Sequence, residues 1–114
     1  MTRTTKYVAF DVHQATTVTS VREESGRVLA RSILETHGPS IVEFLRGLRG
    51  AIHVAFEEGT QAQWLHELLA PQVERVVVCD RRGEPRQGNK GDFVDADKLS
   101  EGLRRGSPHP ARGW

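Results

Sequence analysis

The chain has 114 residues, of which 37% are hydrophobic and 27% charged, and its formal net charge is only +1. That length suits one domain with one core. No apolar run approaches the roughly 20 residues that a membrane-spanning helix needs, and no secretory leader is recognisable. The single Cys79 excludes an internal disulfide, and no zinc-like cysteine and histidine spacing is present. We therefore expect a cytoplasmic protein that does not interact with membranes.

Three strands are predicted at the start of the chain. Residues 6–12 are mostly apolar on both faces, which favours a central strand. Residues 15–22 and 27–35 contain many β-branched and alternating apolar side chains. The turn-forming residues 24–27 separate them, so the short connections predict an antiparallel meander.

A helix and a fourth strand follow. Ser40 and Glu43 have the spacing of a capping box, which predicts a helix over about 40–48 that ends at Gly50. Residues 51–56 are again apolar and predict the fourth strand.

The next helix and strand repeat this pattern. Thr60 and Gln63 form a second capping-box spacing, and the helix after them is expected to bury Trp64 on its apolar side. Pro71 ends this helix. Residues 73–79 then predict a fifth strand.

The last part of the chain is polar. Residues 80–91 are rich in glycine and basic residues and predict a long loop, a kind of segment that is often functional. Asp92 is expected to cap a third helix that ends at Gly106. Residues 107–114 contain two prolines and no periodicity, which predicts a disordered tail.

The expected order is therefore β-β-β-α-β-α-β-α. A meander followed by right-handed crossovers predicts an α/β fold with a five-stranded mixed sheet and helices on both faces. The first and fourth strands would be parallel neighbours, so that their carboxyl ends meet where open α/β sheets place their sites.

Carboxylates stand at both of these strand ends. Asp11 closes the first strand, and Glu57 and Glu58 follow the fourth. By strand alternation, Asp11 shares a face with Ala9, and Glu57 shares a face with Ala55. We therefore expect Glu57 to be the partner of Asp11, with Glu58 taking its place if the strand bulges.

Two further acids, Asp92 and Asp95, are three residues apart, the spacing of one helix face. Alternatively, they are a cap and a first-turn acid favoured by the helix dipole. Converging carboxylates suit Mg²⁺, a hard cation that prefers oxygen ligands, and paired Mg²⁺ ions support phosphodiester cleavage. His13 either assists such a site or is an ordinary surface histidine.

Basic residues gather in the loop before these acids. Arg81, Arg82, Arg86 and Lys90 would contact a phosphate backbone beside the carboxylates. The alternative is a solvated charged loop.

Three segments, Phe10–His13, His53–Glu57 and Asn89–Leu99, together resemble the DEDD-type insertion-sequence transposases. This family includes pilin-gene inversion recombinases and RNA-guided bridge recombinases. The resemblance implies an N-terminal RuvC-like, RNase H-like domain over residues 1–106.

The resemblance also implies a function. Asp11, Glu57, Asp92 and Asp95 would be the catalytic tetrad that binds Mg²⁺ or Mn²⁺ and acts on DNA during transposition. The implied partners are DNA, a guide RNA, and further copies of the chain or a full-length transposase, in a bacterial cytoplasm.

The chain departs from the family at two points. Gly91 stands where threonine is usual before the third acid, and Asp97 where a basic or neutral residue is common. The family's C-terminal domain, with its nucleophilic serine, would follow the third helix. We therefore expect a truncated transposase that cannot exchange strands alone.

The sequence is also compatible with two other functions. One is a non-catalytic remnant that binds nucleic acid or full-length transposase. The other is an actin-like phosphotransfer domain, because hydroxyl-bearing Thr16 and Thr17 follow Asp11. A phosphate-binding hairpin of that kind needs a glycine where this chain has His13, which argues against it.

Overall fold

The computed structural model describes residues 4–80, 93–106 and 110–111. Its helices and strands occur in the predicted order and types. The strands are β1 (Thr5–Val12), β2 (Thr16–Glu23), β3 (Val28–Glu35), β4 (Ala51–Glu57) and β5 (Arg75–Cys79), and the helices are α1 (Gly38–Arg46), α2 (Ala62–Leu69) and α3 (Val94–Arg105).

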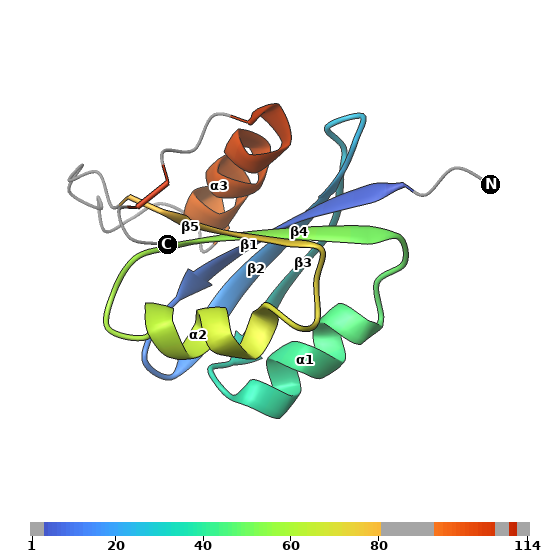
Figure 1. The fold of residues 1–114 in the computed structure, drawn as a ribbon. Coiled ribbons are helices and arrows are strands. Elements are labelled where there is room, and N and C mark those ends of the chain that lie inside the picture. The colour runs from blue at the N-terminus through green and yellow to red at the C-terminus, as the bar shows by residue number, and fades with distance from the viewer. Residues whose placement is uncertain (1–3, 81–92, 107–109, 112–114) are drawn as a thin grey trace.

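The five strands form one mixed sheet in the order β3-β2-β1-β4-β5. β1 is antiparallel to β2 and parallel to β4, and β2 is antiparallel to β3. The predicted meander and the parallel pairing of the first and fourth strands are therefore confirmed. Helices α1 and α2 cover one face of the sheet and α3 covers the other (Figure 1).

The sheet carries a hydrophobic cluster on each face. The larger one, under α1 and α2, contains Phe10 and Phe56 packed with Ile41 and Leu65. The smaller one, under α3, contains Ala55, Val77, Cys79 and Leu103. Because Val8, Ala9 and Phe10 are fully buried, β1 is covered on both sides, as its sequence predicts.

Helix α1 begins two residues earlier than expected. Its N-cap is His37, whose side chain makes no capping hydrogen bond, and Pro39 occupies the first turn. Proline suits this position because its missing N–H has no partner there in any case. The Ser40 hydroxyl lies 3.1 Å from the His37 ring instead of capping the helix. The predicted capping box of Ser40 and Glu43 is therefore wrong.

Helix α2 also starts without the predicted cap. Its N-cap is Gln61, again with no side-chain hydrogen bond to the helix, and Gln63 donates to Glu67 at 2.8 Å. Thr60 therefore does not cap this helix. Trp64 is 38% exposed, so its predicted burial is wrong as well.

Helix α3 begins at Val94, with Phe93 as its N-cap and no side-chain cap. Asp92, the cap predicted from the sequence, lies outside the described residues. The helix ends at Gly106, whose φ of +73° is the left-handed conformation typical of a helix C-terminus.

Part of the segment expected to be disordered lies against β5. Pro110 forms an antiparallel bridge with Cys79, and the Ala111 amide donates to the Val78 carbonyl at 2.8 Å. Ala111 is buried in the larger cluster. These two residues lie alongside the last two residues of β5.

In the part of the chain that the structure describes, no helix has both the length and the apolar character required to cross a membrane.

Candidate functional site at the strand ends

Strands β1 and β4 end side by side. Ala9 pairs with Ala55 and Phe10 with Phe56, so the parallel register continues to Asp11 and Glu57. Alternation places both acids on the face that carries α3, together with the two alanines. The register therefore places Asp11 and Glu57 at neighbouring strand ends, and their pairing as metal ligands stays a prediction.

A cleft of about 410 Å³ opens at this edge of the sheet. Asp11, Glu57 and Glu58 line it together with apolar side chains from β1, β4 and α2. Three polar residues also line it, which the sequence analysis did not identify: Gln14, Thr60 and Gln61. They lie in the connections that follow β1 and β4, which is where the residues of such a site are expected.

Asp11 is almost buried. Its side chain is 7% exposed, and Oδ2 lies 3.2 Å from Nε2 of His13, which is 44% exposed. A hydrogen bond from the imidazole to the carboxylate would hold Asp11 in a defined orientation. His13 is thus an exposed histidine that contacts the site acid.

Glu57 and Glu58 take different directions at the end of β4. Glu57 pairs with Cys79, and the Glu58 amide donates to the Cys79 carbonyl at 2.9 Å. The ladder therefore continues without a bulge, and alternation keeps Glu57 on the α3 face. Burial, and to a lesser extent the negative charge of Glu57, raise the pKa of the Cys79 thiol to about 11.

Helix α3 runs antiparallel to β1. Near its start, Asp97 accepts a hydrogen bond from Ser20, whose strand partner is Ala9. Near its end, Arg104 donates to the carbonyl of Glu24 in the β2–β3 turn. The first turn of α3, which contains Asp95, therefore lies toward the carboxyl end of β1.

The described residues do not complete a metal site. Asp95 is exposed, and within residues 4–80, 93–106 and 110–111 no three acidic, histidine or cysteine side chains form a group that could hold a metal ion. Asp11 and Glu57 are brought together, and Asp92 lies outside the described residues. The oxygen donors of Asp11 and Glu57 suit a hard divalent cation.

Asp97 belongs to a separate network that the sequence analysis missed. Its carboxylate accepts from the Ser20 hydroxyl at 2.7 Å and forms an ion pair with Arg31 at 2.9 Å. Burial alone would raise the pKa of Asp97, but the hydrogen bonds from Arg31 and Ser20 and the charges of Arg31 and Arg22 lower it. This acid joins α3 to the sheet and does not line the cleft.

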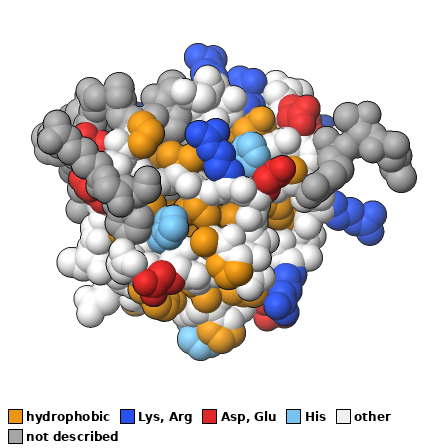
Figure 2. All heavy atoms as spheres, viewed as in Figure 1, with side chains coloured by type: hydrophobic (Ala, Val, Ile, Leu, Met, Phe, Trp, Pro, Cys, Tyr) orange, Lys and Arg blue, Asp and Glu red, His pale blue; other side chains and the backbone are white. Residues whose placement is uncertain are grey.

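The predicted nucleic-acid contacts, Arg81, Arg82, Arg86 and Lys90, lie outside the described residues. Elsewhere, the face shown in Figure 2 has its Lys and Arg side chains scattered among acidic, histidine and hydrophobic ones. The basic loop therefore remains the predicted source of phosphate contacts.

Together, these features define an α/β protein with a mixed five-stranded sheet and three carboxylates, those of Asp11, Glu57 and Glu58, in a cleft at the ends of parallel strands. Comparisons with models of protein families, with curated proteins and with solved structures found no match to this chain.

Proposed function

We propose that this chain is the RNase H-like, RuvC-like domain of a DEDD-type DNA transposase or recombinase. It would bind Mg²⁺ or Mn²⁺ and act on DNA in the transposition of an insertion sequence. The observation that supports this proposal is the position of Asp11 and Glu57, side by side in a cleft at the carboxyl ends of β1 and β4.

In this proposal the carboxylates of Asp11 and Glu57 hold the cation, with Asp92 and Asp95 as the remaining ligands. When bound, the metal would activate water and stabilise charge on a scissile phosphate. His13 would orient the Asp11 carboxylate through their 3.2 Å contact.

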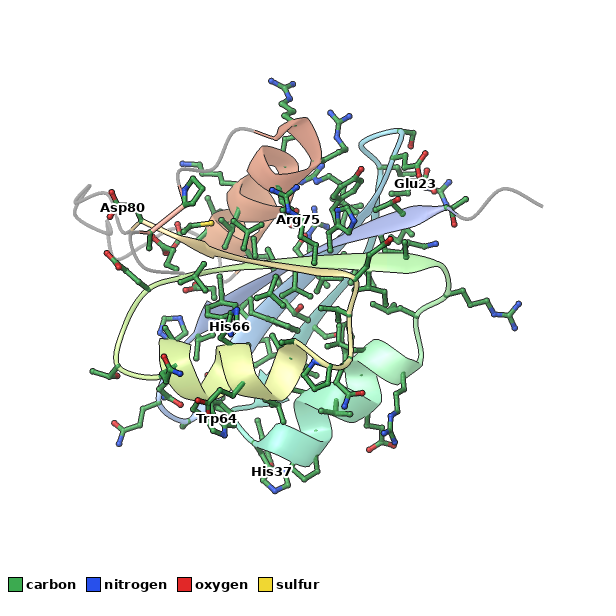
Figure 3. The ribbon with its side chains drawn as sticks, in the orientation of Figure 1. Glu23, His37, Trp64, His66, Arg75 and Asp80 are labelled. Atoms are coloured by element: carbon green, nitrogen blue, oxygen red, sulfur yellow. The ribbon has the colours of Figure 1, made fainter. Side chains whose placement is uncertain are left out.

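The basic loop is attached at the same edge of the sheet. Asp80, directly before it, lies at the end of β5 (Figure 3), and Phe93, directly after it, caps the helix end that lies toward the carboxyl end of β1. We expect Arg81, Arg82, Arg86 and Lys90 to contact DNA phosphates close to the cleft.

Calorimetric titration with Mn²⁺ tests the metal site. The native chain should bind Mn²⁺, and Asp11→Asn and Glu57→Gln should each weaken binding by at least about tenfold, because each removes a proposed ligand. Glu58→Gln tests which of the two neighbouring acids is the ligand: it should bind Mn²⁺ like the native chain if Glu57 holds the cation. Glu67→Gln, on the exposed side of α2, is the matched control and should bind like the native chain.

Equal Mn²⁺ binding by the native chain and Asp11→Asn would contradict the proposal. A second candidate is a non-catalytic, nucleic-acid-binding remnant, which the exposure of Asp95 favours. In that case DNA binding would survive Asp11→Asn, and the native chain would show no Mg²⁺-dependent nicking of supercoiled DNA.

A further inference from the structure

The strand-end cleft contains more than the two carboxylates of the proposed metal site. Its volume of about 410 Å³ lies within the range of about 300–1,000 Å³ that small-molecule sites occupy. Alternation along β1 and β4 divides its lining between the two faces of the sheet. Asp11 and Glu57 belong to the α3 face, whereas Phe10, Phe56 and Glu58 belong to the face that carries α2. The cation proposed above does not use this second part of the cleft.

The floor of the cleft on the α2 side is apolar. It is formed by four side chains that are no more than 4% exposed: Phe10, Phe56, Ala62 and Leu65. Val12 lies beside them and is only partly buried. A ligand group that rests on this floor must be apolar on the side that touches it, because a polar group would lose its water without gaining a partner.

The walls of the cleft are polar. Gln14 stands on one wall, in the connection between β1 and β2, and Glu58, Thr60 and Gln61 stand on the other, in the connection between β4 and α2. Glu58 and Gln61 are half-buried. Among the residues that the structure describes, the side chains of these four make no hydrogen bond or ion pair. Two amides, a hydroxyl and a carboxylate are therefore available to a ligand.

Hydrogen bonds fix the backbone of both walls. On the first wall, the Thr36 hydroxyl donates to the His13 carbonyl at 2.7 Å. On the second, the Ala62 amide donates to the Gly59 carbonyl at 3.1 Å. The cleft is therefore formed before a ligand enters, and little ordering entropy opposes binding.

An apolar floor between polar walls suits a flat ring with polar edges. A nucleobase has this shape, and in nucleic-acid recognition amide side chains bond to base edges while carboxylates accept from an exocyclic amine. Because an ionised carboxylate only accepts, Glu58 favours a base that carries such an amine, namely cytosine, adenine or guanine. Uracil and thymine instead present one ring N–H between two carbonyl oxygens, which repel a carboxylate.

We propose that this cleft is a subsite for an unpaired nucleobase with an exocyclic amine. Glu58 accepts from the amine, and Gln14 and Gln61 bond to the other polar atoms of the base. The inference rests on the proposed action of this chain on DNA, and it assigns the base next to the phosphate at Asp11 and Glu57. That base must be unpaired, because a base inside a duplex is stacked and its pairing edge is occupied.

The cation and the subsite contribute differently to binding. Three carboxylates in one cleft repel a DNA phosphate, and a cation at Asp11 and Glu57 offsets this repulsion for every sequence. Glu58 and the two glutamines instead determine which base is preferred. The ratio of the affinities for two bases therefore reports on the subsite, whereas the absolute affinity reports on the cation and on phosphate contacts.

Fluorescence anisotropy with two short single-stranded DNA probes tests the subsite. Oligodeoxycytidine and oligodeoxyuridine have the same charge and nearly the same size, but the first carries an amine where the second carries a carbonyl oxygen. With Ca²⁺ present, the native chain should bind the cytidine probe at least about fivefold more tightly. Glu58→Gln should reduce this ratio to about one, and Gln61→Met should reduce it at least about twofold. Gln63→Met is the control and should keep the ratio, because Gln63 is exposed on α2 and donates to Glu67.

Asp11→Asn separates this inference from the proposed function. It should weaken binding of both probes and leave their ratio unchanged. A native chain that binds Mn²⁺ through Asp11 but binds both probes equally, or binds neither, would overturn the subsite and not the metal site. A ratio that persists while native chain and Asp11→Asn bind Mn²⁺ equally would support the subsite and contradict the metal site.

Nuclear magnetic resonance on the native chain provides a readout that does not depend on how a variant folds. The side-chain amide signals of Gln14 and Gln61 should shift when the cytidine probe is added, and those of Gln63 should not. Shifts confined to other parts of the chain would place the bound DNA outside the cleft and overturn the proposal.

Discussion

At the scale of single residues, backbone alternation determines which acids meet. Asp11 and Glu57 each follow a small alanine on the same face, and the pairs Ala9–Ala55 and Phe10–Phe56 bring the strand ends level. This placement needed only the strand period and the parallel register. Cys79 pairs with Glu57 in the next strand, where burial and, to a lesser extent, the charge of Glu57 raise the pKa of its thiol.

Cys79 should react slowly with thiol reagents. With its pKa raised from 9.0 to about 11, the thiolate fraction at pH 8 falls by about 100-fold relative to the unfolded chain. Alkylation rates with and without urea measure this difference. Because the folded pKa is the higher one, the native state loses stability as pH rises from 9 toward 11.

Glu57→Gln should lower the pKa of Cys79 and accelerate alkylation, whereas Glu58→Gln should leave the rate unchanged. Equal rates in both variants would show that Glu57 does not face Cys79.

Gly50 controls the turn between α1 and β4. Its φ is +89°, and an added Cβ would lie 2.2 Å from the Thr4 carbonyl oxygen, which accepts a hydrogen bond from the Ala51 amide. Gly50→Ala should therefore lower the free energy of unfolding by about 1–3 kcal/mol, as measured in urea. Gly59→Ala should cost less than about 0.5 kcal/mol, because no heavy atom of the other described residues, its two chain neighbours aside, lies within 4 Å of the added Cβ. Similar losses in both variants would contradict this account.

At the scale of elements, α3 is held to the sheet largely by polar contacts. Arg22 donates to the Ser100 hydroxyl at 3.1 Å and to the Asp97 carbonyl at 3.0 Å, and Asp97 pairs with Arg31 and Ser20. Only a small apolar cluster around Leu103 supports them. This polar network therefore positions the helix whose first turn carries Asp95.

Asp97→Asn should lower the free energy of unfolding by about 1–3 kcal/mol at pH 7. We expect a value near the lower limit, because Arg31 is partly exposed and solvent screens its charge. The pKa of Asp97 is lower in the folded state than its ordinary value of 3.8. Its contribution is therefore present above pH 3.8 and is lost as pH falls through the folded pKa.

Urea unfolding of both chains between pH 7 and pH 3 should show the difference between them shrinking in acid. Asp95→Asn, in the same helical turn, is the control and should cost about 0.5 kcal/mol or less. A difference between native and Asp97→Asn that does not change with pH would contradict an ionised Asp97.

Helix starts were the least predictable feature at this scale. The capping-box spacings at Ser40 and Thr60 both suggested starts that the chain does not use. At α1, Pro39 suits the first turn, so the helix begins before Ser40. Local hydrogen-bonding patterns of this kind compete with tertiary packing, and packing of the apolar side decides the outcome.

At the scale of the whole molecule, connection lengths and handedness rules account for the topology. A meander followed by crossovers leaves β1 at the centre, with β3 and β5 at the edges (Figure 1). The cleft therefore opens on one side of β1, between β1 and β4. On the other side of β1, Asp11, Val18 and Ile33 form one cross-strand row that ends at the edge strand β3.

The sequence by itself determined the order of the eight elements, the central position of β1 and the presence of Asp11 and Glu57 at neighbouring strand ends. These features depend on periodicity and chain connectivity, which are local properties. Only the tertiary structure decided that Asp97 joins α3 to β2 and β3, that Trp64 is exposed, and that Gln14 and Gln61 line the cleft. Those features depend on contacts between segments far apart in the chain, and no local pattern encodes them.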